Sequence, residues 1–208
     1  GVKAAIVPFH AWLPDAHPAA PTPISALLSG VVIKTGVYAI IRSLSLVLHP
    51  ASIDWGMVVS VLAVFAAMTM TVGNIMALLQ NDIKRLLAFS SIAQMGYILL
   101  AVSVGLTGGA VGVLGLTSGL LHIMNHAIMK GLLFLCAGAF IYSAGTRNLD
   151  DLKGIGHLMP VTAVIFGVGA LAISGVPPFN GFVSELLIIL STLNAGLTIF
   201  AVIMLANI

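Results

Sequence analysis

The chain has 208 residues, of which 60% are hydrophobic and only 7% are charged. Soluble domains carry about 25% charged residues, so this composition excludes a protein that stays in water. The formal net charge of +2 is too small to favour binding to nucleic acid. The one cysteine, Cys136, excludes disulfides and cysteine-ligated metal clusters as organising features.

Several runs of 18 or more mainly apolar residues predict transmembrane helices, and the sequence therefore predicts an all-α, polytopic transmembrane helix bundle. Because the chain begins within GVKAAIVPFH, without Met, and ends in an apolar run, we expect an internal piece of a longer membrane protein. In chain order, the expected elements are a first broken helix at about 1–21, spans at about 22–48, 56–80, 86–104 and 111–143, a second broken helix at about 161–193, and the start of a further span at 196–208.

Prolines interrupt two of these elements. Residues 1–21 hold four prolines and cannot form one continuous helix, so we expect a break near Pro8, followed by a short segment and a loop. Asp15 and His17 are expected in that loop. In the stretch SGVPPFNGF, Pro177 and Pro178 lack the backbone donors that a continuous helix needs.

The two interruptions share a weak repeat, because PFHAW in the first resembles PFNGF in the second. Paired broken helices are typical of transporters that are built from inverted repeats.

Basic residues are concentrated in two loops, 80–85 and 144–160, whereas the loops 49–55 and 105–110 contain none. The two basic loops are separated by two spans, so they face the same side of the membrane. The positive-inside rule assigns that side to the cytoplasm. Asp82, at the end of the first basic loop, is expected to cap the helix that follows.

The segment LLHIMNHAIMKGLLFL, residues 120–135, places three ionisable residues in an apolar run. His122, His126 and Lys130 are four residues apart, so a helix presents them on one face over about 12 Å. Because a charge at the centre of a membrane helix costs about 2.5–3.5 kcal/mol, such groups usually face the protein interior or a water-filled path. A proton path and a structural network that ties helices together both explain this stripe. Two histidines at this spacing can also share a metal, but no adjacent carboxylate or thiol completes a site.

Three further ionisable residues lie in or beside the predicted spans. Lys34 is about twelve residues into its span, too deep to reach the surface easily. Glu185 lies in the early turns after the second break, where the helix dipole favours a carboxylate and burial disfavours it. Lys3 precedes the first break. The structural alternatives are a bond from Lys34 to backbone carbonyls, a lysine partner for Glu185, and a Lys3 that extends to the membrane surface.

Four segments carry a resemblance to a known family, and they are VPFHAWLPDAHPAAPTPISALL, DIKRLLAFSSIAQMGY, HIMNHAIMKGLLFL and MPVTAVIFGVGALAISGVPPFNGFVSE. They resemble the antiporter-like membrane subunits shared by respiratory complex I, Mrp-type Na⁺/H⁺ antiporters and membrane-bound energy-converting hydrogenases. The resemblance covers essentially the whole chain. It implies a fold of about fourteen transmembrane helices with inverted repeats and a broken helix in each repeat.

The same resemblance implies a relay of ionisable groups along the membrane midplane. Lys3 matches the lysine at the first broken helix, and Lys34 matches the lysine of the helix that follows. His126 matches the histidine on the long central helix, and Glu185 matches the last position of the path. Gln94 stands where one branch has a histidine and cannot titrate, so the relay is expected to be one group shorter there.

Two more residues complete the implied relay, because His122 and Lys130 match a fuller His-His-Lys version found in some branches. The resemblance further implies a glutamate partner for Lys3 on a helix upstream of residue 1.

The function that the resemblance implies is translocation of H⁺ or Na⁺ by a non-redox subunit of an oxidoreductase or of an Mrp antiporter. We expect no cofactor in this chain. The expected partners are the ion, the other membrane subunits of the complex and the lipid bilayer, and the expected location is a prokaryotic cytoplasmic membrane.

Two other functions stay open. A self-contained membrane enzyme that reduces quinone is disfavoured, because the chain has no cysteine cluster and no glycine-rich dinucleotide fingerprint. A structural membrane scaffold is disfavoured by the number of ionisable residues in the spans.

Overall fold

The computed structural model describes residues 1–44 and 54–208, and their regular structure is helical apart from one isolated β-bridge. The all-α fold with discontinuous helices predicted from the sequence is confirmed. The end of the expected span 22–48 and most of the loop 49–55 lie outside the described residues. The helices are α1 (Trp12–Ala19), α2 (Thr22–Leu27), the π-helical turn η1 (Leu28–Val32), α3 (Ile33–Arg42), α4 (Trp55–Leu78), α5 (Ile83–Gly105), α6 (Gly109–Ala144), α7 (Ile155–Leu158), α8 (Pro160–Ile173), α9 (Asn180–Asn194) and α10 (Thr198–Asn207).

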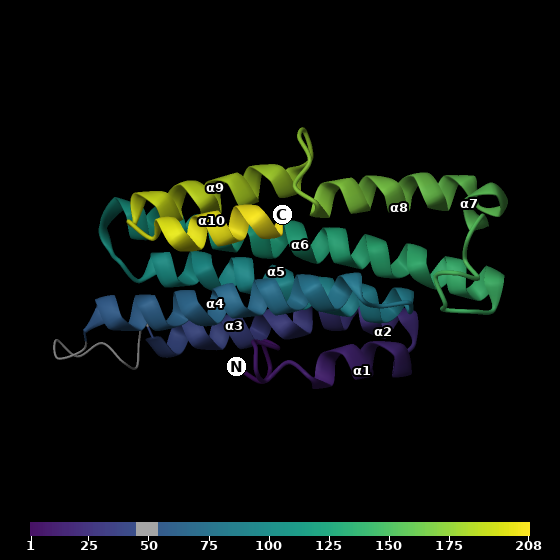
Figure 1. Cartoon of the computed structure of the whole chain (residues 1–208), viewed down its shortest axis with the longest axis horizontal. Helices are drawn as coiled ribbons and strands as arrows, with labels where there is room; N and C mark the ends of the chain where they lie inside the picture. The colour runs from purple at the N-terminus through teal and green to yellow at the C-terminus, as the bar shows by residue number, and fades with distance from the viewer. Residues whose placement is uncertain (45–53) are drawn as a thin grey trace.

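The long helices lie side by side, with α5 between α4 and α6 (Figure 1). Helices α1–α3 lie along one edge of the bundle and α8–α10 along the opposite edge. Four helical segments in the described part of the chain are long and apolar enough to cross a membrane: Thr22–Arg42, α4, α5 and α6. Of these, α5 is buried along almost its whole length, so it forms the centre of the bundle.

Helix α6 is the longest of the described helices, with 36 residues. It is about 54 Å long from the helical rise per residue, against a hydrocarbon core of about 30 Å. It ends at Gly145, which has a positive φ of 69° and whose N–H donates to the carbonyl of Ile141 at 2.9 Å. Glycine adopts this left-handed conformation without steric cost, which explains why the helix stops there.

The first broken element differs from the expectation. Residues 1–11 form turns, and residues 12–19 form the helix α1, so the prediction of Asp15 and His17 in a loop is wrong. Pro14 does not prevent the helix, because it lies in the first turn, where backbone N–H groups have no helical acceptor. His17 is fully buried, and its ring stacks on Phe134 with the centroids 4.6 Å apart.

The second broken element consists of α8 and α9, and the chain loops out between them (Figure 1). Helix α8 ends at Ile173 and α9 begins at Asn180, with Pro177 and Pro178 in the connection. A Cβ atom on Gly181 would overlap the carbonyl oxygen of Ala172. Glycine at this position therefore lets the start of α9 lie against the end of α8.

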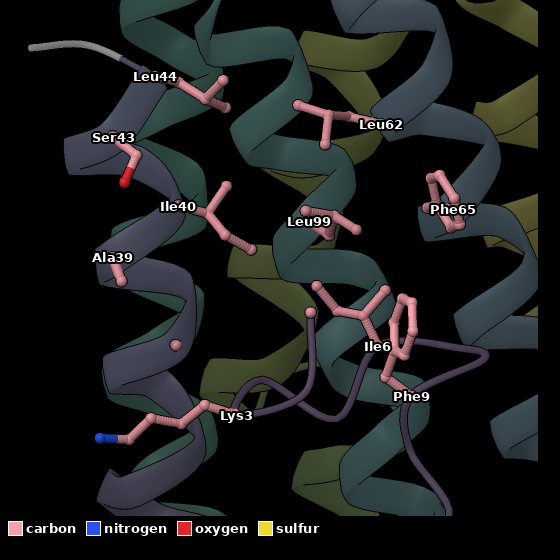
Figure 2. A pocket seen from close by; sticks show the side chains of 12 residues that line it. Lys3, Ile6, Phe9, Ala39, Ile40, Ser43, Leu44, Leu62, Phe65 and Leu99 are labelled. Carbon is pink, nitrogen blue, oxygen red and sulfur yellow. The ribbon is translucent and has the colours of Figure 1, made fainter. Parts of the chain in front are cut away.

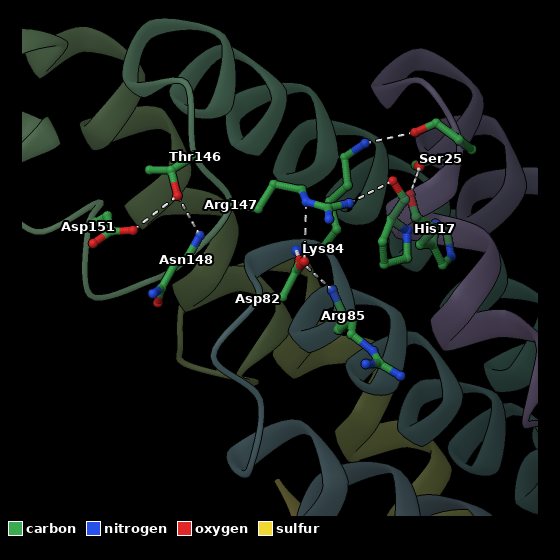
Figure 3. Close-up of polar contacts among 11 residues, drawn as sticks. His17, Ser25, Asp82, Lys84, Arg85, Thr146, Arg147, Asn148 and Asp151 are labelled. Atoms are coloured by element: carbon green, nitrogen blue, oxygen red, sulfur yellow. Dashed lines mark hydrogen bonds and ion pairs between the residues drawn. The ribbon is translucent and has the colours of Figure 1, made fainter.

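The two basic loops meet at one end of the bundle (Figure 3). The backbone N–H of Ile83 donates to the carbonyl of Arg147 at 3.1 Å, and the N–H of Leu149 donates to the carbonyl of Asn81 at 2.8 Å. The two loops thus lie on the same side, as the charge pattern predicts. The predicted cap is also confirmed, because Asp82 Oδ1 accepts hydrogen bonds from the backbone N–H groups of Lys84 and Arg85 in the first turn of α5, at 2.8 and 3.2 Å.

Cationic side chains from this end hold the last turn of α1. Lys84 Nζ donates to the carbonyl of Ala20 at 2.8 Å, and Arg147 donates to the carbonyl of Pro18 at 2.8 Å. Cations are favourable at a helix C-terminus, where backbone carbonyls lack helical partners. These bonds fix the first broken element against α5 and the loop that follows α6.

Helices α4 and α5 approach closely at two glycines. A Cβ on Gly73 would lie 2.5 Å from the backbone nitrogen of Ala93, and a Cβ on Gly96 would lie 2.6 Å from the backbone nitrogen of Met70. Small residues let the backbones of membrane helices approach, and the gain in packing there stabilises the pair.

This geometry predicts that Gly96→Ala destabilises the protein, because the new methyl group meets backbone atoms that cannot move independently. The expected loss is about 1–3 kcal/mol, which is typical of an overpacked interior. The matched control is Gly131→Ala, since a Cβ at Gly131 meets no atom within 4 Å. Unfolding of the purified full-length protein in detergent measures both variants, and equal stability of the two contradicts the close approach.

Candidate functional site

The ionisable stripe of α6 faces the interior of the bundle. His122, His126 and Lys130 are fully buried, whereas Met124 and Ile128 on the other face are about two-thirds exposed. The helix thus turns its apolar face toward the outside of the described bundle and its polar face toward α5 and α9. The prediction that Lys34, His126, Lys130 and Glu185 face the interior is confirmed, because all four are buried.

Lys3 lies apart from the other predicted relay residues. It is exposed and lies at the edge of a cavity of about 450 Å³ between the first residues of the chain, α3, α4 and α5. Figure 2 shows its ammonium group pointing away from the apolar side chains of Ile6 and Phe9. The structure therefore does not bring Lys3 together with the buried histidines.

His122 is the centre of a hydrogen-bonded group that joins three helices. Its Nε2 lies 2.6 Å from Gln94 Oε1 on α5, and its Nδ1 lies 2.9 Å from Ser184 Oγ on α9. The amide nitrogen of Gln94 lies 3.5 Å from Glu185 Oε1. Gln94 therefore connects His122 with Glu185, although its side chain cannot titrate.

The partners of His122 suit both of its protonation states. Gln94 Oε1 accepts a hydrogen bond from Nε2–H, so a neutral ring must accept a hydrogen bond at Nδ1, with the Ser184 hydroxyl as donor. When Nδ1 also carries a proton, the same hydroxyl can accept from it and donate to the carbonyl of Gly181, 3.0 Å away. Rotation of one hydroxyl thus accommodates gain or loss of a proton on the ring.

Two buried groups beside this network have atoms without a partner. Both ring nitrogens of His126 and the Oε2 atom of Glu185 form no hydrogen bond with the described residues. The rings of His126 and His122 are nearly parallel, with the centroids 6.2 Å apart. Because buried polar atoms are normally paired, such exceptions mark positions where a role other than stability has to be considered.

The two buried lysines bind backbone carbonyls. Lys130 Nζ donates to the carbonyl of Leu87 at 3.0 Å, and Lys34 Nζ donates to the carbonyl of Ser29. In the part of the chain that the structure describes, neither lysine forms an ion pair. A carbonyl accepts from an ammonium and from a neutral amine alike, so these bonds are compatible with loss of a proton.

Sequence patterns identified the charged members of this group but missed the residues that connect them. The sequence predicts Gln94 only as a gap in the relay, and Ser184 carries no charge that would mark it as a member. The one signal in the sequence that could have identified Ser184 is its position next to Glu185, in the turn that follows the helix break. In residues 1–44 and 54–208, no group of three or more His, Cys, Asp or Glu side chains is arranged to hold a metal ion.

The fold and the site together define a polytopic helical membrane protein with discontinuous helices around a buried row of ionisable side chains. Residues 1–208 match the family described as "NADH:quinone oxidoreductase/Mrp antiporter, TM", and the chain belongs to that family. It is thus an antiporter-like membrane subunit, the class that the sequence motifs indicated.

Known relatives come from different complexes. The chain is 43% identical over 192 residues to hydrogenase-4 component B of Escherichia coli. The aligned region covers 89% of this chain and 28% of the relative. It is 39% identical over 207 residues to NADH-quinone oxidoreductase subunit N of Desulforudis audaxviator, and this alignment covers 100% of this chain and 40% of the relative. A chain in the structure of the Mrp complex from Dietzia sp. matches with a TM-score of 0.88 and 34% identity, over 99% of this chain and 37% of that one. The chain thus spans less than half the length of these relatives.

The site predicts that Lys130 is not needed for folding. In Lys130→Met, a side chain of similar volume replaces a buried cation, and the carbonyl of Leu87 keeps its bond from the Ser91 hydroxyl. We expect this variant to unfold at the wild-type temperature or above it. Lys130→Ala leaves a cavity and is expected to lose about 2–5 kcal/mol. Thermal unfolding of the full-length protein compares the two, and a Met variant as unstable as the Ala variant means that the ammonium group holds the fold together.

Proposed function

We propose that this protein is an ion-translocating, non-redox subunit of a larger membrane complex, and that it moves protons through the buried group of Lys34, His122, His126, Lys130 and Glu185. The observation that carries the proposal is the connected set of His122, Gln94 and Glu185 in the interior of the bundle, with His126 stacked beside it. Each ionisable member can hold a proton, and each is shielded from lipid.

Protons suit these residues better than Na⁺ does. Transporter sites for Na⁺ are built from backbone carbonyls and other oxygen ligands. The described group consists mainly of amine and imidazole nitrogens, which bind protons. In the proposed mechanism, redox chemistry in other subunits drives the transfer, or this chain exchanges ions without redox chemistry, and in either case it holds no cofactor.

Electrostatic coupling would order the transfer steps. In a medium of low dielectric, a charge acts strongly on its neighbours, because water does not screen it. A proton that arrives at Lys130 raises the cost of a second positive charge on His126, and a proton that arrives at His122 favours the carboxylate form of Glu185. The charge state of each group thus changes the proton affinity of the next without a large movement of helices.

The proposal predicts that Lys130→Met and Glu185→Gln abolish most ion pumping while the complex still assembles. Each variant keeps the shape of the side chain and removes its ability to exchange a proton. The assay is pumping per assembled complex in reconstituted vesicles. The controls are Lys153→Met and Asp151→Asn, which make the same chemical changes in the exposed loop. A scaffold protein gives the opposite result, with loss of assembly and full pumping by each complex that forms.

We further propose that the two basic loops face the cytoplasm of a prokaryotic cell, and that lipid and the other membrane subunits of the complex surround the bundle. The relatives that share this fold carry names of complexes, such as the Mrp complex and NADH-quinone oxidoreductase. The clustering of Lys84, Arg85 and Arg147 at one end of the bundle is the observation that supports the orientation.

This orientation predicts which loop reacts with a membrane-impermeant maleimide. In a Cys136→Ala background, a cysteine that replaces Asp151 should react in inside-out vesicles and not in intact cells. A cysteine that replaces Thr107, in the loop at the other end, should react in intact cells. The reverse pattern contradicts the proposed orientation.

A further inference from the structure

The proposed relay has a gap between Lys34 on α3 and Lys130 on α6. Each lysine binds a backbone carbonyl, that of Ser29 for Lys34 and that of Leu87 for Lys130. A carbonyl oxygen accepts a hydrogen bond but has no proton to pass on. Transfer between the two lysines therefore needs a group with an exchangeable proton.

Two serine hydroxyls occupy the position between the lysines. Ser29 Oγ, in the π-helical turn η1, lies 2.7 Å from Ser91 Oγ on α5, and both side chains are fully buried. Ser91 Oγ also donates to the carbonyl of Leu87 at 2.9 Å. This is the same oxygen that accepts from Lys130. Ser29 thus binds Lys34 through its carbonyl and Ser91 through its hydroxyl, and Ser91 shares the carbonyl of Leu87 with Lys130.

The number of protons fixes the direction of the two hydroxyls. A serine hydroxyl has one proton, and a carbonyl can only accept. Because the Ser91 proton points to the carbonyl of Leu87, the proton in the bond between the serines comes from Ser29. Both hydroxyls therefore point from the Lys34 side toward the Lys130 side.

Ser29 differs from Ser103 and Ser118, which are also buried. Ser103 donates to the carbonyl of Leu100, and Ser118 donates to the carbonyl of Gly115, each within its own helix. Such bonds satisfy a hydroxyl without reaching another helix. Ser29 instead bonds a hydroxyl on a neighbouring helix, which is a contact that secondary structure alone does not require.

We propose that the Ser29–Ser91 hydroxyl pair passes protons between Lys34 and Lys130. The inference rests on the proposed function. In one concerted step, an N–H bond of the Lys34 ammonium breaks and its proton joins Ser29 Oγ, the Ser29 proton joins Ser91 Oγ, and the Ser91 proton joins the neutral amine of Lys130. Lys34 ends as an amine and Lys130 as an ammonium, and each serine again holds one proton.

The step requires each lysine to exchange a carbonyl partner for a hydroxyl partner. Lys34 Nζ moves from the carbonyl of Ser29 to the hydroxyl of the same residue. Lys130 Nζ moves from the carbonyl of Leu87 to Ser91 Oγ, which is bound to that carbonyl. The serine hydroxyls then rotate back before the next proton passes.

The experiment measures pumping per assembled full-length complex in reconstituted vesicles for Ser29→Ala and Ser91→Ala. We expect each variant to pump at about one tenth of the wild-type rate or below it, in line with the loss of a positioned proton-transfer group. Ser91→Thr keeps a hydroxyl and is expected to retain most of the rate. Ser103→Ala, on the same helix and equally buried, is the matched control and is expected to pump at the wild-type rate.

The outcomes separate this inference from the proposed function. If Lys130→Met and Glu185→Gln stop pumping but Ser91→Ala pumps normally, the inference that the hydroxyl pair passes protons is wrong, and the proposed relay of ionisable residues is retained. If Lys130→Met pumps normally, both fail. If the alanine variants lose assembly but each assembled complex pumps fully, the pair is structural and the inference is overturned. Should Ser91→Ala not assemble at all, Ser91→Cys has a similar size and a weaker hydrogen bond, and an unchanged rate for it overturns the inference as well.

Discussion

Inside a membrane, a polar side chain has no water to bind, so its partners must come from the protein itself. This constraint explains the central position of α5. The amide of Gln94, the hydroxyl of Ser91 and the carbonyl of Leu87 all lie on this helix, about one turn or two apart. They bind groups on α6, α9 and η1, so the helix that is most buried is also the one that satisfies its ionisable neighbours.

Close packing keeps these bonds within reach. Gly73 and Gly96 bring α4 onto α5, and Gly181 lets α9 start against the end of α8. If α9 lay further away, Ser184 and Glu185 would lose contact with His122 and Gln94. The glycines therefore affect the proton-binding group although none of them takes part in its chemistry.

The sequence was sufficient to locate the charged residues, because a charge in an apolar run is costly and its burial follows from that cost. It also identified the interruption by Pro177 and Pro178 and the cap at Asp82, which depend on local backbone chemistry. It did not reveal the role of Gln94, Ser29 or Ser91. Their contacts join helices that are far apart in the chain, and only the packed structure brings them together.

The position of prolines within a turn explains why the sequence does not predict α1. Four prolines indicated an irregular segment, but the effect of a proline depends on its position within a turn, and the sequence does not show where a helix begins. His17 looked like a loop residue for the same reason. Its burial against Phe134 depends on α6, more than a hundred residues further along the chain.

The two faces of α6 limit how this helix can move. Consecutive residues are about 100° apart around a helix axis, so turning α6 by a single residue would bring Lys130 toward the outer face of the bundle and Ile128 toward the interior. Exposure of one such charge costs about 2.5–3.5 kcal/mol on insertion scales. Its bond to Leu87 and the bonds of His122 to Gln94 and Ser184 would break as well. The helix is therefore locked against rotation about its own axis, and any switching in its interior has to come from side chains and hydroxyl protons that turn while the backbone stays still.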